Sequence, residues 1–207
     1  MPLSITLQEA GKRYNREWIF RHLSFTFHPG TAYAITGPNG SGKSTLLQII
    51  AGAVGASEGK ITYNINGVAV PDAGIYKHIA FAAPYLELVE EMTLREFLAF
   101  HIQFKPFYSN ITIEAAAEAV GLSKALNKQI VHFSSGMKQR LKLAQAFFSH
   151  TPVLLLDEPT SNLDAEGIAV YHNLVQQYTK ERMVVVSSND EAEYKFCTEG
   201  LRISDYK

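Results

Sequence analysis

The chain has 207 residues, of which 46% are apolar and 19% charged. This composition is typical of a globular protein rather than a disordered one, and the length suits a single domain over 1–207 with a sizeable core. Lys and Arg number 19 and Asp and Glu 20, so the net charge is −1, which argues against a broadly basic surface for nucleic acid or anionic membrane. The single cysteine, Cys197, cannot form an internal disulfide, which favours a reducing compartment.

The first residues alternate between apolar and polar and lack the basic start and apolar block of a secretory signal. No stretch reaches the roughly 18 apolar residues of a membrane span. Two strands, over 3–7 and 18–27, are expected to form a sheet near the start. A buried strand is expected over 31–36 and a helix over 44–51, which Gly52 stops.

Further strands are predicted over 60–65 and 78–82, and Asn66-Gly67 indicates a hairpin turn after the first of them. The pattern then becomes helical, with helices expected over 93–103, 113–120 and 135–149. The last third of the chain alternates strands and helices, expected over 153–156, 166–178, 183–187 and 201–203. Together these elements predict an α/β fold with a mainly parallel sheet, an N-terminal antiparallel β part and a helical insertion at about 93–150.

A glycine-rich sequence between the strand at 31–36 and the helix at 44–51 fits the pattern G-x-x-x-x-G-K-[ST]. Such a loop wraps a phosphate chain, because its backbone N–H groups and the helix N-terminus attract anions. Lys43 would neutralise phosphate charge, Ser44 would ligate Mg²⁺, and Thr45 would support them through its hydroxyl. The remaining residues of the pattern are Gly37, Pro38, Asn39, Gly40, Ser41 and Gly42.

Two carboxylates, Asp157 and Glu158, end the apolar run 153–156. Ligands gather at the carboxyl ends of parallel strands, so Asp157 suits the Mg²⁺ and Glu158 suits the polarisation of an attacking water. Taken alone, the pair fits solvated loop charges as well. The phosphate loop in the same chain favours the catalytic interpretation.

The sequence resembles the nucleotide-binding subunit of ATP-binding cassette (ABC) proteins over essentially its whole length. The order of motifs is a Walker A sequence at 37–45, a signature-like FSSGMKQR at 133–140, a Walker B sequence at 153–158 and a D-loop-like segment at 161–164. The signature is the most specific of these, although Ser134 or Ser135 also suits an ordinary helix cap. The resemblance implies ATP and Mg²⁺ as ligands.

The resemblance also implies a head-to-tail pair, in which Ser134, Ser135 and Gly136 of one subunit face the γ-phosphate held by the other. By the same resemblance, Asp164 would link the two sites and Tyr14 would stack on adenine, although an ordinary strand-end tyrosine also fits position 14. It implies separate transmembrane permease subunits as partners, no nucleic acid, and a place in the cytoplasm at the membrane face. The acidic, apolar segment 85–91 lies where the family receives its membrane subunit, and a solvated loop fits it equally well.

Two positions depart from the family pattern. Pro84, or else Ala83, stands where the family has a glutamine, and Asn189 stands in place of its switch histidine. Asn189 donates a hydrogen bond but cannot carry a proton or a positive charge. Three explanations stay open: a working ATPase, a slow ATP-clamped switch, or a pair whose other subunit hydrolyses. The leading expectation is a subunit that powers a transporter, with Glu158 and Asn189 catalytic, and the alternative is a non-transport switch or weakly hydrolysing regulator.

Overall fold

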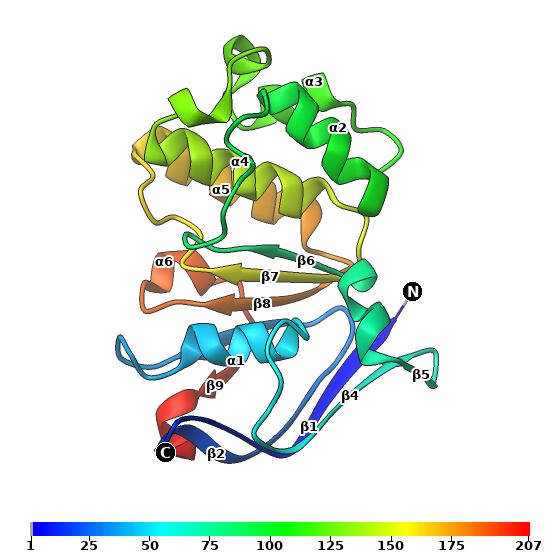
Figure 1. Cartoon of the computed structure of the whole chain (residues 1–207), viewed down its shortest axis with the longest axis vertical. Coiled ribbons are helices and arrows are strands. Elements are labelled where there is room, and N and C mark those ends of the chain that lie inside the picture. The colour runs from blue at the N-terminus through cyan, green and yellow to red at the C-terminus, as the bar shows by residue number, and fades with distance from the viewer. Residues whose placement is uncertain (1) are drawn as a thin grey trace.

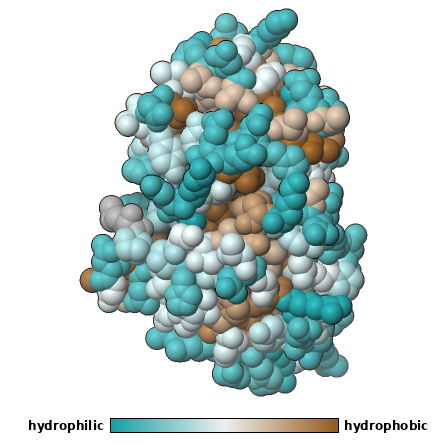
Figure 2. Space-filling view, turned by 180° about the vertical axis from the view of Figure 1, so that it is seen from behind, coloured by the Kyte–Doolittle hydropathy of each residue, from teal (hydrophilic) through white to brown (hydrophobic). Residues whose placement is uncertain are grey.

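The computed structural model describes residues 2–207. Figure 1 shows three layers, in which a parallel sheet lies between a helical layer and a second layer formed by one helix and an antiparallel sheet. Seen from behind, both ends of the molecule are mostly hydrophilic, and apolar residues gather across its middle (Figure 2). The predicted α/β class with a mainly parallel sheet is confirmed.

The antiparallel sheet has the order β2-β1-β4-β5. Its strands are β1 (Leu3–Tyr14), β2 (Glu17–Phe27), β4 (Glu58–Ile65) and β5 (Val68–Val70). The first strand is longer than the predicted 3–7 because a bulge between Leu7 and Ala10 interrupts the alternation without ending the pairing. The predicted hairpin is confirmed: Asn66 and Gly67 have φ angles of 52° and 80°, as a type I′ turn requires.

The parallel sheet has the order β6-β7-β8-β3-β9. Its strands are β3 (Ala32–Thr36), β6 (Ile79–Ala82), β7 (Val153–Asp157), β8 (Met183–Ser187) and β9 (Glu199–Arg202). All residues of β7 and β8 are buried, which explains their continuous apolar runs. Strand β9 begins two residues earlier than the predicted strand over 201–203, and its last residue, 202, lies one residue before the predicted end. Its first two residues are exposed and not apolar, so they carry no strand signal in the sequence.

The helices are α1 (Lys43–Ile50), α2 (Leu94–Phe104), α3 (Ile113–Ala119), α4 (Ser135–Phe148), α5 (Ala165–Tyr178) and α6 (Glu191–Tyr194). Three of them, α2 to α4, fall in the predicted insertion between β6 and β7. Helix α6 and four short 3₁₀ segments were not predicted, since each is too short to show periodicity. Within residues 2–207, no helix combines the length and apolar character needed to cross a membrane.

Two apolar cores lie on opposite faces of the parallel sheet. Strand β7 contributes to both, since Leu154 and Leu156 join the core beneath α4 and α5, whereas Val153 and Leu155 join the core beneath α1. Because side chains alternate along a strand, Asp157 continues the row of Val153 and Leu155. The strand therefore places this carboxylate on the α1 face of the sheet.

Candidate nucleotide-binding site

The loop between β3 and α1 is built on glycines with positive φ angles. Gly37 has a φ of 148° and Gly42 one of 103°. A Cβ on Gly42 would lie 2.3 Å from Cγ2 of Ile19, and one on Gly37 would lie 2.8 Å from Oγ of Ser41. The tight path of this loop therefore excludes side chains at both positions.

The lysine of the loop is held in place by the loop itself. Nζ of Lys43 donates hydrogen bonds to the carbonyl oxygens of Gly37, at 2.8 Å, and Pro38, at 3.3 Å. No side chain caps the N-terminus of α1, and no acidic residue lies in its first turn. The N–H groups and the positive dipole end of α1 are thus available to an anion.

A cavity of about 230 Å³ adjoins this loop. It is lined by Ile19, by Glu158, and by the loop and helix residues 39–45. The structure thus brings the predicted loop residues Asn39 to Thr45 together with Glu158. Ile19 was not predicted, because a strand isoleucine carries no signal for a ligand site.

Asp157 is 1% exposed, and neither of its carboxylate oxygens has a hydrogen-bond partner within the described part of the chain. Oγ of Ser187 is likewise buried without a partner, and Ser187 is the residue of β8 paired in register with Asp157. An unpaired buried carboxylate is costly unless a cation or its waters satisfy it. Oxygen ligands are those that Mg²⁺ prefers, so Asp157, Ser187 and the Ser44 hydroxyl fit that ion.

Glu158 follows Asp157 but leaves the strand. Its φ angle is 40°, a value uncommon for a residue with a side chain, and its N–H donates to the carbonyl oxygen of Ser187 at 2.9 Å. This turn exposes the Glu158 carboxylate to the loop cavity while Asp157 stays buried beneath it. The two adjacent carboxylates therefore occupy different environments, as separate roles require.

Tyr85, in the segment after β6, lies near the carboxylate of Asp157. Its ring packs edge-on against Phe81, with the ring centroids 6.4 Å apart. Burial, and then the charge of Asp157, raise the pKa of the Tyr85 hydroxyl, which thus lies within electrostatic reach of that carboxylate without a hydrogen bond to its oxygens. Of the two residues expected at the family's glutamine position, Ala83 is buried and the carbonyl of Pro84 accepts a bond from Lys142.

Removal of this hydroxyl should slow turnover. We expect Tyr85→Phe to lower kcat by about tenfold, because the buried Asp157 carboxylate loses a polar neighbour, with little change in the Kd for ATP. Steady-state hydrolysis and nucleotide titration measure the two quantities, and Tyr76→Phe, an exposed tyrosine elsewhere on the chain, is the matched control. An unchanged kcat would show that the hydroxyl has no part in the reaction.

Asn189 lies beside the phosphate loop. Its Nδ2 donates to Oδ1 of Asn39 at 2.7 Å. Asn189 follows β8 and Asn39 lies in the loop after β3, so the contact joins two neighbouring strand ends. The amide is thus positioned to donate to a phosphate that the loop holds.

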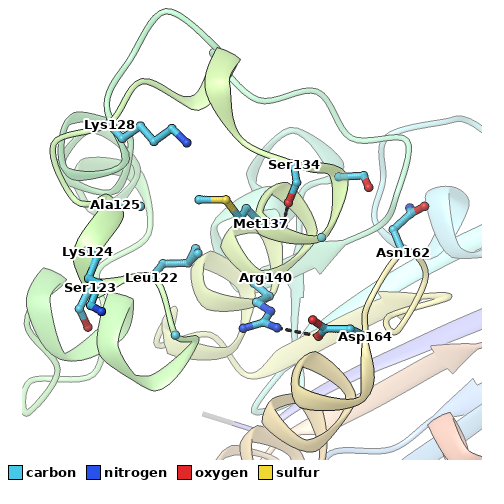
Figure 3. A pocket seen from close by; sticks show the side chains of 13 residues that line it. Leu122, Ser123, Lys124, Ala125, Lys128, Ser134, Met137, Arg140, Asn162 and Asp164 are labelled. Carbon is cyan, nitrogen blue, oxygen red and sulfur yellow. Dashed lines mark hydrogen bonds and ion pairs between the residues drawn. The ribbon is translucent and has the colours of Figure 1, made fainter.

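The signature-like sequence begins α4. Oγ of Ser134 accepts a hydrogen bond from the N–H of Met137 at 3.2 Å, so the helix-cap interpretation is correct. Ser134 and Ser135 are exposed, and they line, together with Gly136, a cavity of about 780 Å³. Figure 3 shows Lys128 and Met137 extending toward the middle of this cavity. A Cβ on Gly136 would lie 3.0 Å from the carbonyl oxygen of Asn162, so this position is crowded.

Asp164 joins the signature helix to the next helix. Its Oδ1 accepts from the N–H of Gly167 at 2.8 Å, which caps α5, and from Arg140 of α4 at 2.7 Å (Figure 3). The bond from Gly167 and then the bond from Arg140 lower the pKa of Asp164. The position of this carboxylate is thus fixed within its own chain.

Tyr14 lies apart from both cavities. It is 47% exposed at the end of β1, with Nζ of Lys12 5.0 Å from the centre of its ring. Neither the loop cavity nor the signature cavity includes it among its lining residues. Stacking of Tyr14 on adenine stays a prediction.

A strand, a glycine loop and a helix N-terminus, opposed by carboxylates at a neighbouring strand end, define a P-loop nucleotide-binding protein. The family model described as ABC transporter matches residues 20–161. The chain belongs to this family, and the resemblance seen in its motifs is confirmed. Members of the family bind ATP and in general hydrolyse it.

Curated relatives agree with this assignment. The chain is 32% identical over 183 residues to an uncharacterized ABC transporter ATP-binding protein, YybJ, of Bacillus subtilis, covering 88% of this chain and 83% of the relative. It is 34% identical over 183 residues to the cytochrome c biogenesis ATP-binding export protein CcmA of Brucella abortus, covering 86% and 81%. The chain is thus similar to ATP-binding subunits of transporters.

Solved structures share the fold. The ATP-binding subunit of an ABC transporter superposes with a TM-score of 0.80 at 25% identity, covering 96% of this chain and 85% of the other. A putative ABC transporter ATP-binding protein from Pyrococcus furiosus superposes with a TM-score of 0.79 at 20% identity, covering 99% of both chains. The second likeness concerns the fold alone.

Proposed function

We propose that this chain binds and hydrolyses ATP as a single domain over 1–207, and powers a membrane transporter through ATP-driven head-to-tail dimerisation. One observation carries this proposal. The loop cavity and the signature cavity share no lining residue, so one copy presents two separate half-sites. Two copies arranged head to tail would place the signature of each against the loop of the other.

The loop residues bind the phosphate chain of ATP. Backbone N–H groups of the loop and the N-terminus of α1 surround the phosphates, and Lys43 exchanges its carbonyl partners for phosphate oxygens. Ser44 and Asp157 would hold Mg²⁺, which supplies charge neutralisation at the phosphates when bound. Burial of Asp157 strengthens the attraction between its carboxylate and such an ion.

Glu158 acts as the general base. Its exposed carboxylate borders the cavity that holds the phosphates, where it accepts a proton from the attacking water. Asn189 donates its amide hydrogen to a γ-phosphate oxygen from the neighbouring strand end. The Tyr85 hydroxyl lies within electrostatic reach of Asp157 and would act through that carboxylate.

The signature helix completes the site from the other copy. Ser134, Ser135 and Gly136 present hydroxyl and N–H groups at the N-terminus of α4, which attracts the γ-phosphate. Asp164, fixed by Arg140, ties this surface to α5. Loss of the γ-phosphate removes the shared charge, so hydrolysis separates the copies.

The transporter role requires separate transmembrane subunits, which would hold this chain at the cytoplasmic face of the membrane. A groove of about 420 Å³, lined in part by 84–88 and by Lys138 and Lys142 of α4, suits their contact. Lys138 pairs with Glu90 across it at 2.5 Å, so the groove is tied to the signature helix. No nucleic-acid partner is proposed, because the net charge is −1.

Copurification tests this role. The tagged chain is recovered from its native host in mild detergent, with and without MgATP, and its partners are identified. A polytopic membrane protein in stoichiometric amount is the expected result. Recovery of soluble partners only, or of the chain alone, would contradict the transporter role.

A second function, an ATP-clamped switch or weakly hydrolysing regulator, is favoured by one observation. Asn189 contacts the loop through a neutral amide, which cannot take up a proton during the reaction. In this account the chain still dimerises on ATP, but turnover is slow. The copurification separates the two functions, because a switch needs no membrane subunit.

A further inference from the structure

A further cavity, of about 600 Å³, lies at the opposite edge of the parallel sheet from the phosphate loop. Its lining includes Gly30, His78, Pro152 and Arg182, which lie one or two residues before strands β3, β6, β7 and β8. Parallel strands begin at one edge of a sheet and end at the other. The ATP half-site lies at the ends of β3 and β7, so the two cavities are separated by the length of the strands.

Arg182 is the buried cation of this cavity. It is 3% exposed, and its guanidinium donates to the carbonyl oxygen of Phe147 at 3.0 Å and to Oγ1 of Thr151 at 2.7 Å. Its Nε has no partner, and within residues 2–207 no carboxylate forms an ion pair with it. Burial lowers the pKa of Arg182 to about 10, an effect that Tyr108 partly opposes. A buried charge with only neutral partners is stabilised by an anion.

The other charged groups of the cavity increase this attraction. Lys77 and the two histidines His78 and His150 line it, and among the lining residues within 2–207 Glu181 is the only acidic one. Burial and then the charge of Lys77 lower the pKa of His78. The cavity therefore has two permanent cations and two titratable ones against one carboxylate.

One wall of the cavity is aromatic and fixed. The rings of Tyr108 and His150 have their centroids 4.9 Å apart. Two backbone hydrogen bonds hold this wall, from Tyr108 to Phe148 at 3.0 Å and from His150 to Pro106 at 2.8 Å. A volume of several hundred Å³ with fixed walls is typical of a site for a small molecule.

We propose that this cavity binds a small phosphate-bearing anion, at a site separate from the ATP half-sites. The phosphate contacts Lys77 and is attracted by the buried charge of Arg182 beneath it, and the rest of the molecule lies against the Tyr108 wall. Tyr108 belongs to the segment between α2 and α3, whereas the cations lie at the start of the parallel strands. A ligand here joins the helical layer to the sheet, so its binding would restrain motion between them.

Calorimetric titration with pyrophosphate tests the proposal. The protein carries Lys43→Ala, which removes the main cation of the phosphate loop. Lys77→Gln and His150→Gln are then added together, since both side chains are exposed and their loss leaves the buried Arg182 and its bonds intact. Lys195→Gln, an exposed lysine outside the cavity, is the matched control in the same background.

We expect pyrophosphate to bind the Lys43→Ala protein, and the two cavity changes to weaken it roughly tenfold or more, as the loss of charge-assisted contacts does. The control should bind as the parent does. Equal affinity with and without the cavity changes, or no binding by the Lys43→Ala protein, would overturn the proposal. Because no arm measures hydrolysis, this result is independent of the transporter role.

Discussion

The Glu158→Gln variant should bind ATP with nearly the wild-type Kd and hydrolyse it at least about a hundredfold more slowly, the usual effect of losing a general base. The amide keeps the shape of the side chain but cannot accept the proton of the attacking water. Lys43, Ser44 and Asp157 are untouched, so the phosphate and metal contacts persist. The ATP-bound dimer should therefore accumulate.

Phosphate release measures the rate, and size-exclusion chromatography with light scattering measures the dimer in MgATP. Glu118→Gln, an exposed and unpaired glutamate on α3, is the matched control and should behave as wild type. Hydrolysis by Glu158→Gln at the wild-type rate would show that another group accepts the proton. A slow variant that stays monomeric in MgATP would separate the catalytic role from the proposed dimerisation.

The Lys43→Ala variant should lose ATP binding rather than turnover alone. Lys43 is buried and already held against the loop by two carbonyl oxygens, so its ammonium is positioned before ATP arrives. Removal of a charge-assisted contact to phosphate should raise the Kd at least about tenfold and reduce hydrolysis to background. Titration with a fluorescent nucleotide measures the Kd, and Lys195→Ala is the control.

A melting curve tests whether Lys43→Ala is still folded, because the Lys43 side chain also donates hydrogen bonds to the loop. The expected melting temperature lies close to that of wild type, since the loop path is set by its glycines rather than by Lys43. An unchanged Kd for ATP in a folded variant would contradict the assignment of the loop.

The parallel sheet and the phosphate loop were predictable because their signals are local. Strands β7 and β8 are buried on both faces and appear as unbroken apolar runs, and the loop demands glycine where φ is positive. The place of Asp157 and Glu158 was predictable too, because they directly follow the apolar run of β7. What the sequence did not show is that a φ of 40° turns Glu158 toward the cavity while Asp157 stays buried.

The segment after β6 was harder to interpret because it has no regular secondary structure. Without a period, the sequence did not decide which of several consecutive side chains faces the site. The placement of Pro84, or else Ala83, at the family's glutamine position stays a prediction. The structure shows that the ring of the next residue, Tyr85, packs against Phe81, and that contact is not visible in a residue pattern. Residues of this kind are found only once tertiary structure is known.

The partners of Asp164 and Arg182 were also beyond the sequence. Arg140 lies 24 positions before Asp164, and the acceptors of Arg182 lie 29 or more positions before it, so no spacing rule connects them. The cavity at the starts of the parallel strands gathers residues from six separate segments, none of which contains a motif. Burial of an arginine without a carboxylate was the feature that identified it.

The central claim, that two copies complete each other's sites, is tested most directly by mixing two inactive variants. Lys43→Ala retains the signature surface, and Ser135→Arg, a change at an exposed position, retains the phosphate loop. Val68→Arg, at an exposed hairpin position, controls for the added charge. In a mixed pair, the intact loop of the Ser135→Arg copy faces the intact signature of the Lys43→Ala copy, so one complete site forms. We predict that each variant alone is inactive and that the mixture regains hydrolysis, whereas an inactive mixture, or full activity of Ser135→Arg alone, would contradict the account.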